Sequence, residues 1–377
     1  MIQLFRQFDH LSFYNKYIIE RDYIIDLVLT KYYTPGSPEY EDYYRRHPEL
    51  KEVDNALRAM PPMGEPGSAT YHPVHSPLVG SAFQFLSEMK HLSEGFPAAE
   101  KTVVPGPEEM TRLLKGLAAY YGARLTGVCA MEDYHYYSHR GRETIHYGNP
   151  IRNSHPYGLV FAVEMEKDMI LRAPGIPESL AAVKGYMEGA MIGMILSYYI
   201  RSLGFDARNH MDGNYLLIAP LVARDGGLGE IGRHGLLITK EYGPRVRLGV
   251  VTTDLPLTAD GPVAFGIQDF CSLCNRCAVS CPGIAIPRGG KELIDGDMRW
   301  RITDTACYQR WRMLGTDCGV CLASCPFSNE LDPSLVDRMA ASPDIMHQLL
   351  REFNQQYRLR PMVKKPVDWF LKNEPVE

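Results

Sequence analysis

Eight of the nine cysteines in this chain of 377 residues lie between positions 271 and 325. They form two runs that each end in Cys-Pro, and the first run has the spacing C-x2-C-x2-C-x3-C-P. With this spacing, one loop binds three corners of an iron–sulfur cube while its last thiolate reaches the neighbouring cube. The sequence therefore predicts two [4Fe-4S] clusters. Their expected ligands are Cys271, Cys274, Cys277 and Cys325 for one cluster, and Cys307, Cys318, Cys321 and Cys281 for the other.

Two other uses of cysteine fit the chain less well. Zinc ribbons pair C-x2-C knuckles, without a third cysteine two residues further on and without the trailing Cys-Pro. The single cysteine outside the two runs, Cys129, lies in an apolar stretch that is typical of a buried thiol. This usage indicates a reducing compartment instead of a disulfide-bonded secreted protein.

Length and charge narrow the class of protein. The chain is too long for a bare ferredoxin and can hold one large domain or two smaller ones. Its formal net charge of -5 and its pI near 6.2 give no general affinity for polyanions, so we expect no nucleic-acid partner. No apolar run reaches the about 18 residues of a membrane span, and residues 1–8 lack a signal-peptide or twin-arginine pattern. We therefore expect a soluble cytoplasmic protein of unknown oligomeric state.

The rest of the sequence divides into an arm, a core and a tail. Residues 1–105 are rich in tyrosine and include a Pro- and Gly-rich passage, which is typical of an extended arm or cover. Residues 106–265 alternate helical and strand-like segments, which predicts an α/β or α+β core. The two-cluster, ferredoxin-like segment is inserted after it at 266–335, and residues 336–377 form a tail, with one helix and an extended end, that packs on the core. Within the core, helices are expected at 107–121 and 178–203, and strands at 125–130, 158–163, 215–223, 234–239 and 246–252.

A glycine-rich segment satisfies G-x-G-x-x-G between Gly227 and Gly232. A dinucleotide site needs a helix after this motif, with its N-terminus facing the pyrophosphate. The following residues, 234–239, are strand-like instead. We therefore interpret the segment as a loop whose backbone closely approaches a large flat ligand or another strand.

Two polar residues of the core have an ordinary structural interpretation. Tyr186 lies on a helix face of small residues, at spacings of three and four that are typical of packing contacts. Arg247 alternates with apolar residues on a strand, which is typical of a solvated face. From the residues alone, neither position predicts catalysis.

The second cysteine run is more specific than cluster spacing alone. From Cys307 to Cys325 it includes Trp311 and the sequence Gly315-Thr-Asp-Cys318. It closely resembles the C-x10-C-x2-C-x3-C-P segment of the corrinoid-dependent reductive dehalogenases. The likeness covers roughly residues 45–370, through the passages 64–73, 119–128, 226–239, 243–247 and 253–255. The chain therefore resembles that family, which is related to the epoxyqueuosine reductases.

This resemblance implies a cofactor besides the clusters. Members of the family hold a base-off cobamide, of the cobalamin or norpseudo-B12 type, on a cobalamin-binding core that resembles the nitroreductase-like fold. The two clusters line up to deliver electrons to cobalt. In this chain the glycine-rich loop resembles the segment that lines the corrinoid. The implied cobamide contacts are Gly227, Leu228, Gly229, Arg233 and Gly235.

The resemblance also changes the interpretation of Tyr186 and Arg247. By its place 13 residues before Tyr199-Ile-Arg201, Tyr186 matches the family's proton-donor tyrosine. Arg247, in Gly243-Pro-Arg-Val-Arg, matches the arginine that supports the tyrosinate. A guanidinium near the phenol favours its charged form, which makes the tyrosine a better acid. Family members add a polar residue near the halide or the donor, and the candidates here, whose register stays open, are Asn209, His210, Asp212 and Asn214.

The sequence as a whole predicts an oxidoreductase, a cobamide-dependent reductive dehalogenase that cleaves a carbon–halogen bond of a small organohalide. No reductase domain follows the clusters, which implies an external reductant such as ferredoxin or flavodoxin. Two alternatives stay open. One is an epoxyqueuosine reductase-like enzyme, although that family usually has basic helices after the clusters and an aspartate as donor. The other is a non-catalytic iron–sulfur electron carrier, which leaves the core without a role.

Overall fold

A four-stranded antiparallel sheet forms the centre of the computed structural model, which describes residues 35–140, 149–294, 297–329 and 331–371. Its strand order is β1 (Leu125–Ala130), β2 (Tyr157–Glu164), β6 (Val246–Thr253) and β3 (Ala207–His210). Strand β2 pairs with β6 over its whole length, from Tyr157 opposite Thr253 to Glu164 opposite Val246. The fold is thus mixed α/β, as expected, with an antiparallel sheet.

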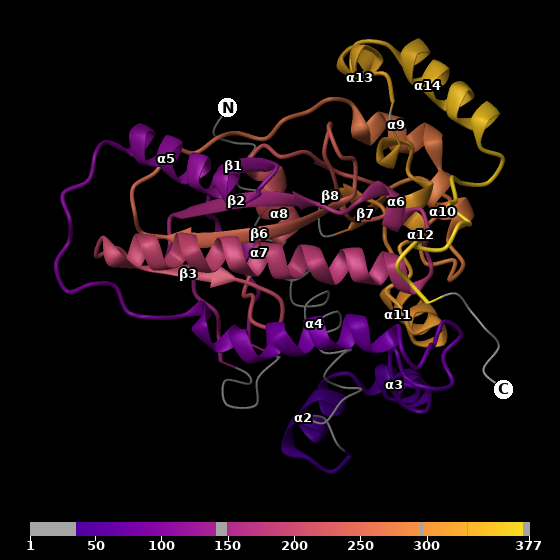
Figure 1. Cartoon of the computed structure of the whole chain (residues 1–377), viewed down its shortest axis with the longest axis horizontal. Coiled ribbons are helices and arrows are strands. Elements are labelled where there is room, and N and C mark those ends of the chain that lie inside the picture. The colour runs from indigo at the N-terminus through magenta and orange to yellow at the C-terminus, as the bar shows by residue number, and fades with distance from the viewer. Residues whose placement is uncertain (1–34, 141–148, 295–296, 330, 372–377) are drawn as a thin grey trace.

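Both faces of the sheet are buried, because successive residues of a strand point to opposite sides. On one side, Leu159 and Phe161 of β2 pack with residues of the long helix α7 (Ile176–Ser202) and of α5 (Pro107–Tyr120). On the other side, Val160 and Ala162 pack with residues of α8 (Ala219–Asp225). Helix α7 runs along the sheet, and its N-terminal end lies toward the cysteine-rich segment (Figure 1).

The other elements flank this core (Figure 1). The N-terminal region supplies α2 (Pro38–Arg46), α3 (Lys51–Arg58) and α4 (Ser76–Met89), and the short α6 (Lys167–Ile170) precedes α7. Strands β4 (Glu230–Ile231) and β5 (Leu237–Ile238) form a small hairpin. The cysteine-rich segment and tail contain α9 (Ile267–Cys274), α10 (Arg276–Ser280), β7 (Glu292–Ile294), β8 (Asp297–Arg299), α11 (Asp304–Leu314), α12 (Val320–Ser324), α13 (Pro333–Met339) and α14 (Pro343–Gln356). Short 3-10 helices cover Pro48–Leu50, Lys90–Ser93, Asp133–His135 and Pro326–Ser328.

Across these described ranges, no helix is both long and apolar enough to cross a bilayer.

Most elements expected in the core are confirmed, namely α5, β1, β2, α7 and β6. The predicted strand at 215–223 is wrong. This apolar run enters helix α8, which begins at Ala219 and has Pro220 in its first turn, where proline is well tolerated. The predicted strand at 234–239 is shortened to Leu237–Ile238, and the tail has two helices in place of one.

Strand β3 is not predicted by the sequence, because three of its four residues are polar although all four are buried. Arg208 Nη2 donates to Asn214 Oδ1 at 2.6 Å. His210 Nε2 lies 2.9 Å from Thr252 Oγ1 on the neighbouring strand. The polar groups of this strand therefore find partners inside the fold, which a local hydrophobic pattern does not indicate.

After α14 the chain runs back along the core to the N-terminal region. Val363 N–H donates to the carbonyl oxygen of Leu171, just after α6, at 3.0 Å. Leu371 N–H donates to Nε2 of His75, at the start of α4, at 3.0 Å. The ring of Phe370 lies 4.4 Å from that of His75. The tail thus connects α6 with α4.

Acidification is expected to release this end of the tail. Burial, together with the neighbouring His72, lowers the pKa of His75 below its ordinary value of 6.5. The folded protein therefore favours the neutral ring, whose Nε2 accepts from Leu371. Stability from this contact is fully present above about pH 6.5 and is lost as the pH falls through the lowered pKa. Amide exchange at Leu371, corrected for its intrinsic pH dependence, should stay constant above about pH 6.5 and accelerate as the pH falls below this value through the lowered pKa.

A His75→Gln variant serves as the control for this pH effect. Its amide oxygen can accept the same hydrogen bond but does not titrate. Its exchange at Leu371 should therefore show no acid-induced increase. Equal pH responses in the wild type and the variant would contradict a role for His75.

Candidate active site

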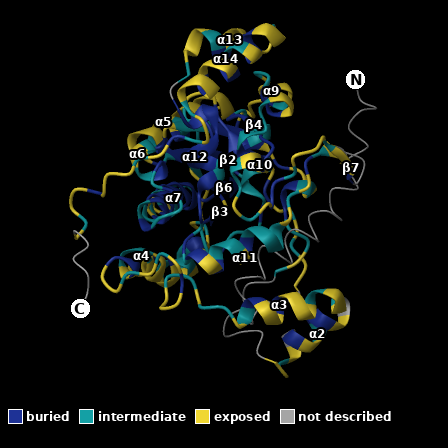
Figure 2. Cartoon of the chain, turned by 90° about the vertical axis from the view of Figure 1, so that its right-hand side faces the viewer, coloured by how far each residue is buried: buried dark blue, intermediate teal, exposed yellow. Residues whose placement is uncertain are grey.

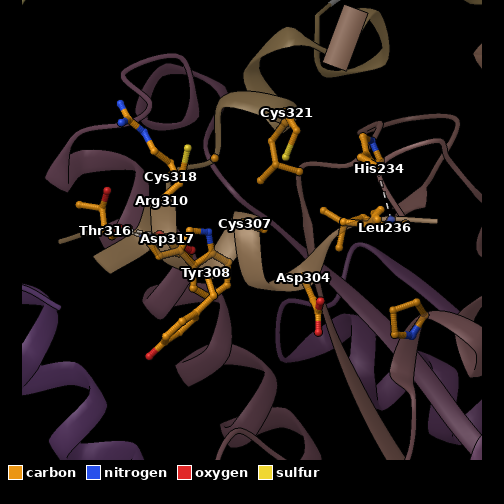
Figure 3. Close-up of a pocket in the computed structure, with 18 of the residues that line it drawn as sticks. His234, Leu236, Asp304, Cys307, Tyr308, Arg310, Thr316, Asp317, Cys318 and Cys321 are labelled. Carbon is orange, nitrogen blue, oxygen red and sulfur yellow. Dashed lines mark hydrogen bonds between the residues drawn. The ribbon is translucent and has the colours of Figure 1, made fainter. Parts of the chain in front are cut away.

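A cavity of about 2360 Å³ lies between the N-terminal region, α7, the β4–β5 hairpin and the cysteine-rich segment. Typical small-molecule pockets have volumes of about 300–1,000 Å³, so this cavity suits a much larger group. Its walls include Phe83 of α4, Tyr186 of α7 and Trp311 of α11. Figure 3 shows one part of a pocket wall, where Cys307, Cys318 and Cys321 lie near Asp317.

Four cysteines line the cavity, and we name them the inner cysteine group: Cys281, Cys307, Cys318 and Cys321. Burial raises the pKa of the Cys321 thiol well above its ordinary value, and the nearby charges of the other members of this group add to the effect. Cys277 also contributes, because the two cysteine groups adjoin.

The remaining four form the outer cysteine group, which is absent from the cavity lining: Cys271, Cys274, Cys277 and Cys325. Burial raises the pKa of Cys325 well above its ordinary value, and the charges of the other three members raise it further. The fold therefore brings the last cysteine of the second run to the first three cysteines of the first run. This arrangement matches the crossed ligand sets expected from the spacing, which stay a proposal until the clusters are observed.

The buried thiols are suited to binding a cationic group. Burial raises the pKa of Cys274 and of Cys277 to about 12, so without a nearby positive charge both stay protonated. Iron ions supply that charge and bind the thiolate form. Within the described ranges, no three His, Cys, Asp or Glu side chains are arranged to hold one metal ion. In a four-iron cube, by contrast, each thiolate binds a different iron.

Tyr186 and Arg247 meet at the cavity wall. Tyr186 projects from α7 and Arg247 from β6, and both line the cavity. The guanidinium carbon of Arg247 lies 4.6 Å from the centroid of the Tyr186 ring. The ring of Phe83 lies on another side of Tyr186, with the two centroids 6.2 Å apart. The arginine and tyrosine that the sequence suggested as partners are therefore in direct contact.

Asp317 holds Arg247 from the other side. Its Oδ2 accepts from Nη2 of Arg247 at 3.0 Å, and its Oδ1 accepts from Oγ of Ser179 at 2.5 Å. Burial disfavours the charged guanidinium, but the charges of Tyr186, Asp317 and other nearby acids keep the pKa of Arg247 above its ordinary value. Arg247 is thus a fixed cation between a carboxylate and a phenol ring.

Glu178 adds a second carboxyl group beside Asp317. Its side chain is fully buried in the first turn of α7, and its Oε1 has no hydrogen-bond partner within the described part of the chain. Burial raises the pKa of Glu178 well above its usual range, and the charge of Asp317 raises it further. Burial beside Asp317 therefore favours the neutral form of Glu178 over a second anion at this point.

The sequence offered four polar candidates for a residue near the halide or the proton donor: Asn209, His210, Asp212 and Asn214. Only Asp212 lines the cavity. Asn209 is fully buried, and its Nδ2 donates to the carbonyl oxygen of Ala190 on α7 at 3.2 Å. A Cβ at Gly193 would lie 2.0 Å from Asn209 Oδ1, so the small residues of α7 permit this close packing. The structure therefore places Asn209 in a packing contact and away from the cavity. His210 and Asn214 are buried in the network around β3.

Of the five residues expected to contact a cobamide, only Gly235 lines the cavity. Leu228 packs in the core beneath the sheet. A Cβ at Gly229 would lie 2.2 Å from the carbonyl oxygen of Ile238, and one at Gly227, whose φ is +82°, 2.8 Å from that of Gly261. The two glycines thus permit close approach of other backbone, which was the alternative interpretation of this loop.

Arg233 contacts the cysteine-rich segment and does not line the cavity. Its Nη2 donates to the carbonyl oxygen of Cys271 at 2.9 Å, and its Nη1 to that of Gly289 at 2.6 Å. Its guanidinium also lies 4.7 Å from the Trp300 ring centroid. Arg233 therefore connects the glycine-rich loop with the outer cysteine group, which sequence reasoning did not predict.

Sequence reasoning also missed Asp317 and Glu178. Asp317 is part of the Gly-Thr-Asp-Cys sequence that we used only as a sign of the cluster-binding segment. A carboxylate directly before a ligand cysteine was a local signal for a further role. Glu178 carried no such signal, because an acidic residue in a first helical turn is ordinary.

Comparison with known proteins agrees with this arrangement. Residues 270–329 match the family model of the 4Fe-4S dicluster domain. A tetrachloroethene reductive dehalogenase of Desulfitobacterium hafniense is 32% identical over 230 residues, which cover 58% of this chain and 39% of that protein. A solved structure of the catabolic reductive dehalogenase NpRdhA in complex with 3-bromo-4-hydroxybenzoic acid matches with a TM-score of 0.69 at 25% identity, covering 84% of this chain and 45% of that one. An epoxyqueuosine reductase of Lactococcus garvieae (strain Lg2) is 28% identical over 134 residues, 34% of this chain and 37% of that protein.

The fold and the two cysteine groups define a two-cluster iron–sulfur protein with a large cofactor cavity. Over 58% of its length the chain is similar to a tetrachloroethene reductive dehalogenase, and its fold is similar to that of the reductive dehalogenase NpRdhA. It spans less than half the length of the two dehalogenases described above.

The similarity to a reductive dehalogenase whose structure suggests B12-dependent dehalogenation implies a corrinoid, and the cavity can accommodate one. Its volume is more than twice that of a usual ligand pocket, and its wall combines aromatic rings with bare backbone. Gly235 has a φ of +76°, which disfavours other residues, so the wall presents bare backbone at this point. The residues present therefore fit a large, flat, mostly neutral cofactor.

Proposed function

We propose that this protein catalyses the reductive cleavage of a carbon–halogen bond in a small organohalide. The contact between Tyr186 and Arg247 inside a cavity that is also lined by ligand cysteines is the observation that supports this proposal most directly. It brings a proton donor and an electron source to one space. We further infer that the cobamide is held base-off and that the core corresponds to the nitroreductase-like fold.

When bound, the corrinoid would supply electrons that cleave the carbon–halogen bond, fed by the two clusters. The chain itself supplies the proton that replaces the halogen. Tyr186 donates it from its phenolic oxygen, and Arg247 stabilises the tyrosinate that forms. Asp212 is the polar residue placed to orient the substrate, and Phe83 and Trp311 exclude water from the same space. Proton transfer from water would compete with transfer from Tyr186 and would be slower.

Two related functions fit the chain less well. An epoxyqueuosine reductase-like activity would require recognition of tRNA, yet the donor matched here is a tyrosine. An electron carrier without catalysis would have no use for the Tyr186–Arg247 pair or for the cavity. The residues around the cavity therefore favour the dehalogenase. We further infer that it acts in the cytoplasm with an external reductant.

A reconstitution experiment tests the proposed function. The protein, purified without oxygen and incubated with cobalamin, iron and sulfide, should hold about eight irons and one cobalt per chain. With a reduced viologen dye it should release halide from a halophenol or a haloalkene. Protein that binds the irons but neither retains cobalt nor releases halide from any tested compound would sink the proposal.

Asp317→Asn should reduce turnover through Arg247. The variant keeps the shape of the side chain but loses the charge that holds the guanidinium over Tyr186. One charge-assisted hydrogen bond contributes about 1.5–3 kcal/mol, so kcat should fall about 10–100-fold with little change in KM. Steady-state kinetics with the viologen dye measure kcat and KM separately.

Two variants separate positioning from general damage. Asp332→Asn makes the same chemical change at an exposed helix cap outside the cavity and should leave kcat unchanged. Asp317→Glu keeps the charge and should recover part of the lost rate. Iron content must be equal in all three variants, since Asp317 precedes Cys318. A full rate in Asp317→Asn would remove Asp317 from the proposed mechanism.

A further inference from the structure

The two cysteine groups lie at different distances from the cavity. All four members of the inner cysteine group line the cavity, and no member of the outer cysteine group does so. Electrons that reach the cavity through both clusters therefore enter at the outer group. The outer group is covered by α9, α10, α13, α14 and the chain after α14, and buried residues of α13 and α14 pack against Cys271 and Cys325. Helices α9 and α10 lie on the side of the molecule that faces the viewer in Figure 2.

The segment that supplies three cysteines of the outer group carries only positive charge, although Glu230 and the Asp344 and Glu352 of α14 lie on neighbouring elements. Residues 270–291 contain Arg276, Arg288 and Lys291 and no Asp or Glu, in a protein whose net charge is -5. The nearest acidic residues in sequence are Asp269 and Glu292, at the two ends of this stretch. The positive charge is thus concentrated where the outer group is bound.

A second segment brings more positive charge to the same place. Nη1 of Arg276 donates to the carbonyl oxygen of Arg358 at 3.3 Å, and Nη2 donates to that of Tyr357. The side chain of Arg358 is exposed beside α10. Arg288 is also exposed, and Arg233 holds its neighbours Pro287 and Gly289 through their carbonyl oxygens. Arg288 and Arg358 therefore border the outer group from two directions.

Exposed apolar side chains lie among these cations. Leu273 lies in sequence between Cys271 and Cys274, and Val279 between Cys277 and Cys281, and their exposed fractions are 44% and 51%. Leu359, next to Arg358, is 70% exposed. Protein–protein interfaces combine an apolar centre with a charged rim. Exposed apolar residues grouped in this way indicate an interaction surface.

We propose that this surface, formed by Leu273, Val279, Arg288, Arg358 and Leu359, is the docking site of a small acidic one-electron carrier protein of the ferredoxin class. The inference rests on the proposed function, because it identifies the source of the electrons. In each encounter the carrier loses one electron and the outer cluster gains it. Two encounters supply the two electrons that, with one proton from Tyr186, convert the carbon–halogen bond into a carbon–hydrogen bond and a halide ion.

The charge of the surface decides between occupants. A second copy of this chain would bring the same cations face to face, which costs free energy. An acidic carrier brings complementary charge, which accelerates the encounter at low ionic strength. The surface therefore fits an acidic partner better than self-association.

Stopped-flow reduction tests the proposal without relying on dehalogenation. Oxidised protein containing both clusters is mixed with a reduced acidic ferredoxin, and the loss of visible cluster absorbance gives the second-order rate constant. Reversing two charges in R288E/R358E should lower this constant about tenfold or more at low ionic strength and flatten its dependence on salt. Reduction by a viologen without net charge should stay unchanged, because a small neutral dye does not sense the surface charges.

The matched control is R112E/R124E, which changes the net charge by the same amount. Both arginines are exposed, on α5 and just before β1, at the opposite end of the molecule from α10 (Figure 1). A drop confined to R288E/R358E supports the docking surface. An equal drop in both double variants, no drop in either, or a dimer of the wild type that R288E/R358E dissociates would overturn it. If ferredoxin reduces the clusters rapidly but no halide is released, the docking surface stands and the proposed function fails.

Discussion

Tyr186→Phe is expected to lower the rate of reductive dehalogenation by about 10²–10⁴-fold, the usual contribution of a positioned proton donor. Phenylalanine keeps the ring that contacts the guanidinium of Arg247 and the ring of Phe83, so the shape of the cavity is conserved. Only the phenolic proton is lost. Binding of cobalamin and reduction of the clusters should therefore stay at wild-type levels, and halide release should not.

The experiment compares halide release, bound cobalt and bound iron in the wild type, Tyr186→Phe and Tyr120→Phe. Tyr120 is 82% exposed on α5, so its hydroxyl can be removed without effect on the cavity. Halide release from Tyr186→Phe at the wild-type rate would show that another group supplies the proton. Loss of cobalt from this variant would instead show that Tyr186 has a structural role in cofactor binding.

The parts of the fold that the sequence predicted well are those with local causes. Strand β1 occupies residues 125–130 as expected, because an apolar run follows the helix stop at Gly122. The crossed pairing of the cysteine runs stays a prediction from their spacing, and the structure places Cys325 near Cys271, Cys274 and Cys277. In both cases the information lies within a few residues of the element concerned.

The parts that the sequence did not predict depend on contacts between distant segments. Strand β3 is stable as a buried polar strand because His210 meets Thr252, 42 positions away. Arg247 becomes a site residue because Asp317, 70 positions away, holds it over Tyr186. Asn209 was a reasonable catalytic candidate by residue type, but the close approach of α7 at Gly193 buries it. No local pattern contains these pairings, which arise when the sheet and the cysteine-rich segment pack on α7.

Removing cysteines in pairs should reveal which thiolates share a cluster. If Cys281 belongs with Cys307, the variant C281A/C307A loses both ligands from one cluster and should keep about four irons in an intact second cluster. The variant C271A/C281A removes one ligand from each cluster, so both should be damaged. Uncrossed ligation predicts the reverse, with C271A/C281A keeping the intact cluster.

Iron analysis and electron paramagnetic resonance of the reduced proteins distinguish these outcomes. C281A/C307A should show the signal of a single, uncoupled reduced cluster, while C271A/C281A should show a mixture or no signal. Cys129→Ala is the control, because this thiol is buried beside the sheet and away from both groups. C281A/C307A should also release no halide, even though its outer cluster still accepts electrons, because the inner cysteine group is the one that lines the cavity. Halide release by this variant would mean that electrons reach the cavity without the inner cluster, and would contradict the order of the two groups along the path.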